Sequence, residues 1–502
     1  MKTNFPHLHL VPRSSSLMIV AFISVLAMLS SGCALLFPAG RPSEPVEALR
    51  YDINHVLSDS IFVQARTSIK IISLDRHEVL YERDSKLLTR PASNMKLVTS
   101  ASALGVLGKD YTFKTPVLVE QSPVDSSVAG NLYIKGLGNP DLVTADLDSL
   151  AELVRAAGVR KINGSVCADV SFFDDSYWGY GWNWDDEPSS YAAFITPLAV
   201  NDNCVVVSVS PGNAPGDSVH VSIDPPTSYV TVLNKAKTVG DSVRHPLVVT
   251  RLFKEHSNTI LVDGEIRTSA NPVENTLSVW KPELYAATLF SEALQRKGIS
   301  VGKAASVEPA PIGSREIVSI SHRIDTTIVN MNKISDNLSA EILLKTLGTT
   351  AAGAPGSAEG GTFVVHRFLS SLGIDTTRFN IVDGSGLSYH DLLTTEMLCQ
   401  LLEGMSKQKE IFPLYLRSLP IAGIDGTLQN RMKRTAAQGN LRAKTGSISG
   451  VSSLSGYVRT QDGEMLAFSM TMQNFILPSR LYRNAQDKIG ALMAGFSRSG
   501  TH

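Results

Sequence analysis

The sequence predicts an α/β fold: an antiparallel sheet with helices, built from both ends of the chain and carrying nested inserted domains, one mostly β. Residues 67–82 alternate between apolar and polar side chains as a β-hairpin does. Residues 442–472 indicate three further antiparallel strands, and a helical pattern at residues 478–496 follows them. The long middle of the chain has helix and strand patterns of its own, which favours an insertion between the two halves of the sheet.

The first 37 residues are a predicted targeting segment. Lys2 and Arg13 make its start positive, and Leu17–Leu29 is an apolar run too short to span a bilayer comfortably. Small residues then precede Cys33 as in a bacterial lipoprotein signal, so we expect Cys33 to be lipidated and to anchor the protein to a membrane. Ser30 departs from that pattern, and a soluble secreted protein or an uncleaved anchor stays open. Each alternative exports the remaining chain, and we expect a periplasmic location.

A buried helix is predicted directly after Ser93. Pro91 precedes it, and apolar side chains follow at helical spacing until Gly108 ends the pattern: Met95, Val98, Leu104 and Leu107. A nucleophile in the first turn of such a helix has backbone N–H groups pointing at it.

The middle of the chain repeats a unit in which a helix ends at glycine and a strand follows. Leu147–Ala157 and Pro282–Lys297 are predicted amphipathic helices of this kind, and the unit is predicted again at Phe363–Gly373. Short β runs dominate residues 196–279. Thr346–Gly361 is rich in glycine and alanine, which predicts a loop.

These patterns predict three domains. We expect a catalytic domain at residues 46–116 and 323–498, an inserted second domain at residues 117–195 and 280–322, and a mostly β third domain at residues 196–279.

Three short strings suggest what the catalytic domain does. They are Ser93-Asn94-Met95-Lys96, Ser335-Asp336-Asn337 and Lys444-Thr445-Gly446, in this order along the chain. A serine hydroxyl is a weak nucleophile until a neighbour takes its proton, and residues three apart on a helix share one face. Other S-x-x-K strings occur in the chain, for example Ser406-Lys407-Gln408-Lys409, so the order of the three strings carries the specificity.

With these motifs, S-x-x-K, S-D-N and K-T-G, the chain resembles the class C low-molecular-mass penicillin-binding proteins, the D-alanyl-D-alanine carboxypeptidase/endopeptidases. The resemblance covers residues 48–496. Further strings similar to that family are Gly136-Leu137-Gly138-Asn139-Pro140-Asp141, Trp182-Asn183-Trp184-Asp185-Asp186, Asn201-Asp202-Asn203-Cys204, Asp383-Gly384-Ser385-Gly386-Leu387-Ser388 and Asp425-Gly426-Thr427-Leu428. It implies a penicillin-recognising serine transpeptidase domain whose first two motifs are separated by a large insertion.

The resemblance also implies an activity. The protein is expected to be a serine D,D-peptidase that cleaves the terminal D-Ala-D-Ala bond of peptidoglycan stem peptides, D-Ala–diamino-acid crosslinks, or both. The reaction is expected to pass through an acyl-enzyme, to need no cofactor, and to be blocked covalently by penicillins and other β-lactam antibiotics.

The chemistry of the motif side chains, in agreement with the family, assigns a role to each. Ser93 attacks the carbonyl of the penultimate D-alanine, and Lys96 accepts the serine proton. Lys96 must then be neutral, and we expect burial and the positive charge of Lys444 to lower its pKa. Ser335 relays a proton to the leaving amine, and Asn337 holds the substrate amide.

Substrate contacts are expected from the third motif and from a loop of the insertion. Lys444 and Thr445 suit a terminal carboxylate, Gly446 adds flexibility, and the backbone N–H groups of Ser93 and Ser447 form an oxyanion hole. In the family, an acid and a tyrosine near Asp186 and Tyr191 receive the free amino end of a peptide side chain. Plain loop structure is the alternative for these two residues, and Asp383-Gly384-Ser385-Gly386 is interpreted as a turn.

Composition excludes other classes of protein. The formal net charge of −1, without a basic face, argues against nucleic acid as a partner, and the 11 scattered histidines argue against a metal site. Cys167, Cys204 and Cys399 are an odd number after processing; one Cys167–Cys204 bridge or buried free thiols are both open. The sequence leaves the oligomeric state unknown.

Two further functions stay as alternatives. A β-lactamase of the same superfamily usually carries a deacylating glutamate followed two residues later by Leu-Asn, and no such string lies between Asn337 and Lys444. A non-catalytic peptidoglycan-binding lipoprotein has no use for an activated nucleophile, so the intact motif residues argue against it.

Overall fold

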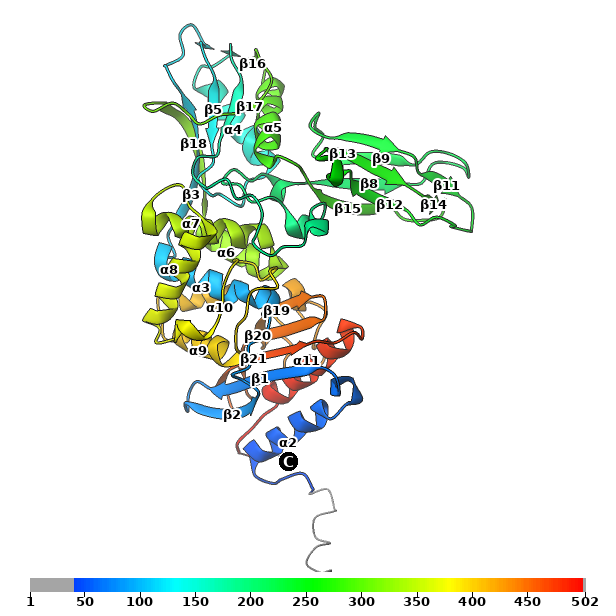
Figure 1. Ribbon diagram of the computed structural model, residues 1–502, viewed down its shortest axis with the longest axis vertical. Helices are drawn as coiled ribbons and strands as arrows, with labels where there is room; N and C mark the ends of the chain where they lie inside the picture. Colours follow the sequence, from blue (N-terminus) through cyan, green and yellow to red (C-terminus); the bar gives the residue numbers. More distant parts are fainter. Residues whose placement is uncertain (1–39, 500–502) are drawn as a thin grey trace, which may run out of the picture.

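The computed structural model describes residues 40–499, and its catalytic sheet joins the two ends of the chain. This five-stranded antiparallel sheet has the order β19-β20-β21-β1-β2 (Figure 1). Its strands are β1 (Arg66–Ser73), β2 (Glu78–Arg83), β19 (Arg442–Ile448), β20 (Val451–Arg459) and β21 (Met465–Gln473). The predicted pairing of strands from both ends in one sheet is confirmed.

Helices cover both faces of this sheet because its strands alternate between two cores. Tyr457 of β20 packs into one core and Val458 into the other. Among the described residues, the first and last helices are α2 (Pro45–Leu57) and α11 (Ser479–Ala494), which contact each other and close one face. The terminal helix is thus present as predicted, with Ala485 and Ile489 of its apolar stripe buried.

The opposite face carries a group of helices that contains the first two motifs. They are α3 (Met95–Leu107), α6 (Ile324–Asn330), α7 (Asn337–Ala352), α8 (Ala358–Ser371), α9 (Thr395–Ser406) and α10 (Phe412–Ser418). The predicted helix after Ser93 is confirmed, and Gly108 ends it with φ +83°, a conformation that glycine adopts without a steric penalty.

The predicted loop at Thr346–Gly361 is wrong. α7 continues to Ala352, α8 begins at Ala358, and only a short connection separates them. The small residues serve close helix packing instead: a Cβ on Gly361 would overlap the carbonyl oxygen of Leu344, and one on Gly348 would lie 2.6 Å from the carbonyl oxygen of Ser357. The strand expected after Gly373 is also absent from the described residues, where a single turn at Thr376–Arg378 follows.

A second five-stranded sheet stands beyond the helices (Figure 1). Its order is β17-β7-β5-β3-β18, with strands β3 (Thr112–Val119), β5 (Leu132–Lys135), β7 (Val166–Asp169), β17 (Ser306–Val307) and β18 (Arg315–Arg323). The predicted helices are confirmed as α4 (Thr144–Ala156) and α5 (Pro282–Arg296), which contact each other beside this sheet. A small sheet of β4 (Ser127–Val128), β6 (Lys161–Ile162) and β16 (Ser300–Val301) continues it.

A separate arm consists of short strands, as expected for residues 196–279. One sheet pairs β8 (Cys204–Ser210) with β9 (His220–Asp224) and β15 (Val273–Ser278). The others contain β10 (Thr231–Asn234), β12 (Val248–Arg251) and β13 (Thr259–Asp263), and β11 (Lys237–Val239) with β14 (Glu265–Arg267). This arm projects to one side of the molecule (Figure 1).

The domain limits stay a prediction, although the strands show where the chain passes between sheets. The predicted limits at residues 116 and 322 fall inside β3 and β18, which pair with each other. Cys167 and Cys204 lie in different sheets, and all three cysteines of the described residues are buried free thiols. The possible Cys167–Cys204 bridge is therefore not formed.

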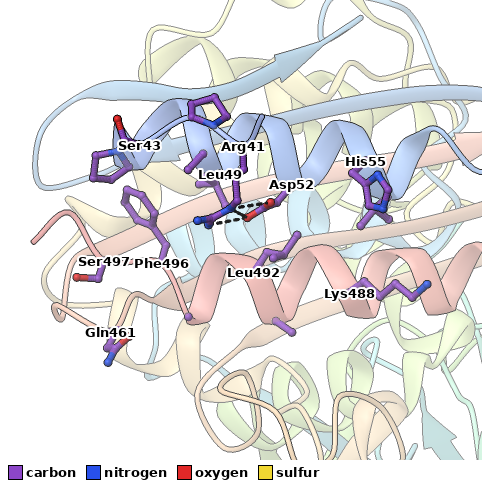
Figure 2. Close-up of a pocket in the computed structure, with 16 residues that line it drawn as sticks. Arg41, Ser43, Leu49, Asp52, His55, Gln461, Lys488, Leu492, Phe496 and Ser497 are labelled. Atoms are coloured by element: carbon purple, nitrogen blue, oxygen red, sulfur yellow. Dashed lines mark hydrogen bonds and ion pairs between the residues drawn. The ribbon is translucent and has the colours of Figure 1, made fainter. Parts of the chain in front are cut away.

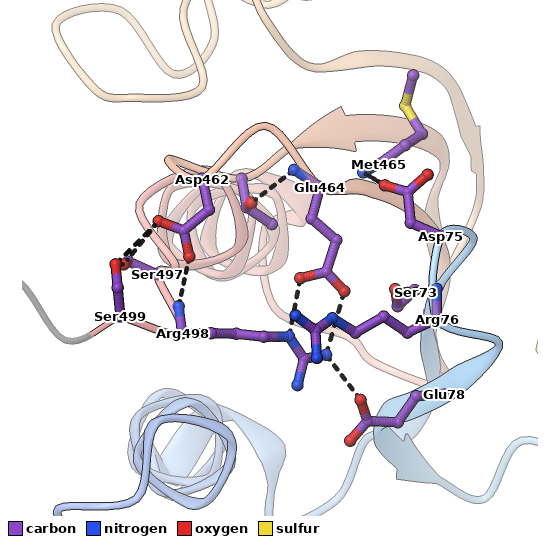
Figure 3. Close-up of polar contacts among 11 residues, drawn as sticks. Ser73, Asp75, Arg76, Glu78, Asp462, Glu464, Met465, Ser497, Arg498 and Ser499 are labelled. Atoms are coloured by element: carbon purple, nitrogen blue, oxygen red, sulfur yellow. Dashed lines mark hydrogen bonds and ion pairs between the residues drawn. The ribbon is translucent and has the colours of Figure 1, made fainter.

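The described residues begin just before α2 and end just after α11. A cavity of about 830 Å³ lies between these two helices, crossed by an ion pair between Arg41 and Asp52 (Figure 2). None of the motif residues lines it. Nearby, the guanidinium of Arg498 donates hydrogen bonds to Glu464, just before β21, and to Glu78 of β2 (Figure 3). These bonds attach the segment after α11 to the sheet.

The targeting segment and Cys33 lie outside the described residues. Among residues 40–499, no helix has both the length and the apolar character needed to cross a bilayer.

Candidate active site

Ser93 lies in a single helical turn, Ala92–Asn94, that leads directly into α3. Ala92 has φ +47°, a left-handed conformation that is unfavourable for alanine and makes the chain turn sharply before Ser93. Two hydrogen bonds to β20 hold this turn: Asn94 donates to Ser455 Oγ at 2.7 Å, and Ser453 donates to the carbonyl oxygen of Pro91 at 2.7 Å. The nucleophile therefore sits on a turn fixed from both sides.

Lys96 is fully buried in the first turn of α3, next to Ser93. Its Nζ lies 3.1 Å from Ser93 Oγ, 2.6 Å from Asn337 Oδ1 and 3.0 Å from the carbonyl oxygen of Ser385. Burial lowers the pKa of Lys96 to about 8, against the opposing effect of nearby carboxylates. A substantial neutral fraction at physiological pH is what a proton acceptor needs.

The charge of Lys444, which the sequence suggested as a second cause, is not among the causes of the Lys96 shift. The reverse effect is present, because burial and then the positive charge of Lys96 hold the pKa of Lys444 well below its usual value.

Ser335 and Asn337 flank the start of α7. Asp336 between them caps this helix, its carboxylate accepting from the backbone N–H groups of Leu338 and Ser339, so its role is structural. The preceding turn, Met331–Ser335, is π-helical, a distortion often found at functional sites. Ser335 ends that turn with φ +67°.

Asn337 links both sides of the site. Its Oδ1 accepts from Lys96, and its Nδ2 donates to the carbonyl oxygen of Tyr191 at 2.7 Å. These two contacts fix the orientation of the side-chain amide.

The third motif lies on edge strand β19. Lys444 is buried, and its Nζ donates to Ser335 Oγ at 2.8 Å and to the carbonyl oxygen of Thr445 at 3.0 Å. Gly446 is required because a Cβ there would overlap Ser453 Oγ and lie 2.8 Å from the carbonyl oxygen of Pro91. The strand can thus approach the turn that holds Ser93.

The motifs meet at a cavity of about 420 Å³. It is lined by Ser93, Asn183, Asp186, Tyr191, Ser335, Asn337, Gly386, Leu387, Tyr389, Ser447, Ile448 and Ser449. Lys96 and Lys444 do not line it but lie behind it, bonded to Ser93 and Ser335. Thr445 and Gly446 are also outside the lining, and Thr445 Oγ1 donates to Thr427 Oγ1 at 2.8 Å.

Asp186 and Tyr191 form the wall that the inserted region contributes to this cavity. Tyr191 Oη donates to Asp186 Oδ1 at 2.6 Å, and Asn183 Nδ2 donates to Asp186 Oδ2 at 3.1 Å. Burial and the bond to Asp186 raise the pKa of Tyr191. A carboxylate at the cavity wall can receive a cation, which is the chemistry expected of these residues.

The sequence did not reveal several residues of the site. Gly386, Leu387 and Tyr389 line the cavity, and the carbonyl oxygen of Ser385 contacts Lys96. The string at residues 383–388 was visible in the sequence and was interpreted as a turn. It is a bent segment outside helices and strands, and it also contributes a partner to Lys96. A backbone carbonyl carries no residue-type signal.

Comparisons with known proteins agree with this geometry. A model of the D-Ala-D-Ala carboxypeptidase 3 (S13) family matches residues 49–495. A D-alanyl-D-alanine carboxypeptidase of Actinomadura sp. (strain R39) is 36% identical over 464 residues, which are 89% of this chain and 85% of that protein.

Solved structures share the fold. The crystal structure of penicillin binding protein 4 (dacB) from Haemophilus influenzae has a TM-score of 0.77 at 23% identity and covers 88% of this chain and 97% of its own. A second structure of that protein, complexed with a novel β-lactam, has a TM-score of 0.72 at 22% identity and covers 88% and 98%.

Proposed function

The chain belongs to the D-Ala-D-Ala carboxypeptidase 3 (S13) family and is a peptidase, and from this we propose that it cleaves peptidoglycan stem peptides through an acyl-enzyme on Ser93. The observation that carries the proposal is that Lys96 Nζ, buried behind the cavity, contacts Ser93 Oγ and Asn337 Oδ1, two side chains that line it. The family that the motifs suggested is confirmed.

Acylation begins when neutral Lys96 takes the proton of Ser93 Oγ, at a separation of 3.1 Å. The serine oxygen attacks the carbonyl carbon of the penultimate D-alanine, and the resulting oxyanion accepts from the backbone N–H groups of Ser93 and Ser447. The close approach of β19 at Gly446 to the nucleophile's turn supports this pairing.

Collapse of the tetrahedral intermediate breaks the C–N bond, and the leaving amine of the terminal D-alanine takes a proton. Ser335 Oγ supplies this proton and is re-protonated by Lys444, which donates to it at 2.8 Å. The proton that Lys96 took from Ser93 replaces the one that Lys444 gave up, so Lys96 is neutral again before hydrolysis. Water then attacks the acyl-enzyme and loses its proton to Lys96, which passes this proton to Ser93 Oγ as the shortened peptide is released. Atoms balance because one water is consumed for each peptide bond broken.

The terminal carboxylate of the substrate, or that of a penicillin, binds beside Lys444 and Thr445. An anion next to Lys444 favours its charged form, and this offsets the burial that lowers its pKa. Endopeptidase action on D-Ala–diamino-acid crosslinks uses the same nucleophile, with the free amine of the side chain at Asp186 and Tyr191.

The reaction requires export, since peptidoglycan lies outside the cytoplasm. The targeting segment and Cys33 supply that export and a lipid anchor in the membrane, with the catalytic body in the periplasm.

A penicillin tests this function. Incubation should add one acyl group to Ser93, detected by intact mass and peptide mapping, and Ser93→Ala should abolish the adduct without loss of the folded state. An adduct that persists on the Ser93→Ala variant would place the nucleophile elsewhere. The lifetime of the adduct separates the alternatives: minutes or longer for a peptidase, rapid release for a β-lactamase, and no adduct for a non-catalytic binding protein.

A further inference from the structure

A pair of carboxyl groups outside the three motifs, Glu341 on α7 and Asp383 in the loop at residues 383–388, is buried behind Lys96. We propose that both are positioning residues, which hold this loop so that the carbonyl oxygen of Ser385 orients Lys96 toward Ser93. The inference rests on the acyl-enzyme function proposed above.

The first step concerns what a neutral lysine can do. An uncharged amine has two N–H groups and one lone pair. Asn337 Oδ1 and the carbonyl oxygen of Ser385 can only accept, and they lie 2.6 and 3.0 Å from Lys96 Nζ. When these two acceptors take the two N–H groups, the lone pair is left for the hydroxyl of Ser93 at 3.1 Å. Losing the Ser385 carbonyl would let the amine rotate away from the nucleophile.

The second step concerns what fixes that carbonyl. The carboxylate of Glu341 accepts from the backbone N–H groups of Gly384 at 3.0 Å and Ser385 at 2.8 Å. Asp383 accepts from the backbone N–H groups of Gly386 at 2.6 Å and Ser388 at 2.7 Å. The two carboxyl groups thus accept from four backbone N–H groups of one loop. These N–H groups lie on both sides of the Ser385 carbonyl that contacts Lys96.

The third step concerns space. A Cβ on Gly386 would overlap the carbonyl oxygen of Ala92, next to the nucleophile, and one on Gly384 would lie 2.5 Å from the carbonyl oxygen of Ala340 on α7. The loop is therefore packed between the Ser93 turn and α7. Asp383 Oδ2 also accepts from Trp182 Nε1 at 3.0 Å, which ties the loop to the segment that carries Asp186.

The fourth step concerns charge. Three carboxylates raise the pKa of Lys96 against the lowering by burial: Asp336, Asp383 and Glu341. Lys444 is a nearby basic group, whose own pKa the charge of Lys96 lowers. Burial and then the charge of Asp383 raise the pKa of Glu341 to about 8, and Asp391, which accepts from the N–H of Val382, also has a raised pKa. Removing the Asp383 charge should therefore lower the pKa of Lys96.

The test compares the second-order rate of Ser93 acylation by a penicillin, as a function of pH, in four proteins. They are the wild type, Glu341→Gln, Asp383→Asn and Asp169→Asn. Asp169 is the matched control, because it is equally buried and accepts from the backbone N–H groups of Ser171 and Ala310, but it lies in the inserted sheet.

Asp383→Asn should slow acylation by about ten- to a hundredfold, the effect of losing a hydrogen bond to a charged group. Glu341→Gln replaces one acceptor oxygen of a mostly neutral carboxyl group by an N–H donor, and should slow acylation by about two- to tenfold. Asp383→Asn should also move the inflection of the pH profile to lower pH. Asp169→Asn should leave both the rate and the inflection unchanged, even where its melting temperature falls.

Wild-type rates and an unmoved inflection in both loop variants would overturn the inference, as would an equal loss of rate in Asp169→Asn. Absence of any acylation of the wild type is a different result, because it would overturn the proposed function itself.

Discussion

Lys96 shows how one side chain acquires a chemical role from its surroundings. In solution a lysine is protonated at neutral pH, but burial lowers the pKa of Lys96 to about 8. Its charged form is disfavoured because three carboxylates only partly offset the loss of water. The acylation rate should therefore rise with pH as Lys96 loses its proton near pH 8 and become constant above it.

Lys96→Arg tests this base directly. Arginine keeps the positive charge but does not deprotonate in a protein, so acylation should fall roughly 10²- to 10⁴-fold and the pH-dependent rise near pH 8 should vanish. Stopped-flow acylation by a chromogenic β-lactam measures both effects. A variant that acylates at a near-normal rate would exclude the lysine-base mechanism.

Asp186 belongs to the same scale, because we propose that this single carboxylate at the cavity wall selects peptides with a free amine. A charge-assisted hydrogen bond to a free ammonium contributes about 1.5–3 kcal/mol, or roughly ten- to a hundredfold in kcat/KM. Asp186→Asn should lower kcat/KM by that factor for peptides whose side chain ends in a free amine.

Two compounds serve as controls for Asp186→Asn: the same peptide with its amine acetylated, and a small penicillin without an amine. Both should react almost as with the wild type. Equal losses for all three compounds would indicate a structural defect and return Asp186 to the role of a loop residue.

At the scale of elements, the packing of α7 against α8 bears on the second motif. Asn337 of that motif is the first residue of α7, so its position depends on where α7 lies. The crossing is close because glycines lie at its contacts. Glu341 of α7 also accepts a hydrogen bond from the backbone N–H of Ser385 in the loop behind Lys96. A shift of this helix would therefore move both Asn337 and that loop.

Gly361→Ala should disturb this crossing. The added Cβ would overlap the carbonyl oxygen of Leu344, and overpacking of this kind costs roughly 1–3 kcal/mol of unfolding free energy. Thermal or denaturant unfolding measures the loss. Ser370→Ala, an exposed position on the same helix, should change the stability by less than about 0.5 kcal/mol. Equal stability of Gly361→Ala and the wild type would contradict the close packing.

At the scale of the whole molecule, the chain enters the second five-stranded sheet along β3 and leaves it along β18, the hydrogen-bonded neighbour of β3. The segment between β3 and β18 also contributes to the site, because its residues Asp186 and Tyr191 line the same cavity as Ser93. α2 and α11, which begin and end the helices of the described residues, contact each other on the far side of the catalytic sheet from the Ser93 helix α3 (Figure 1).

The anchor gives a prediction for the whole protein. If Cys33 is lipidated, Cys33→Ser should move the protein from the membrane fraction to the soluble periplasm, as followed by fractionation and immunoblotting. A variant that stays in the membrane would favour an uncleaved anchor, and a soluble wild type would favour simple secretion.

The sequence by itself determined the family, the strands of the catalytic sheet and the motif residues that meet at the cavity. These are local signals: Ser93 and Lys96 are three residues apart, and the hairpins alternate with a period of two. The chemistry of such residues depends on side-chain type, which a sequence states directly.

The tertiary structure alone decided the rest. Thr346–Gly361 was predicted as a loop because glycine has a low intrinsic helix propensity, yet close packing of α7 and α8 requires small residues at their contact. The third partner of Lys96 is the backbone carbonyl oxygen of Ser385. Every residue has a backbone carbonyl, so the residue type does not indicate this contact. The lowered pKa of Lys96 is a property of its burial, and burial exists only after distant segments have packed together.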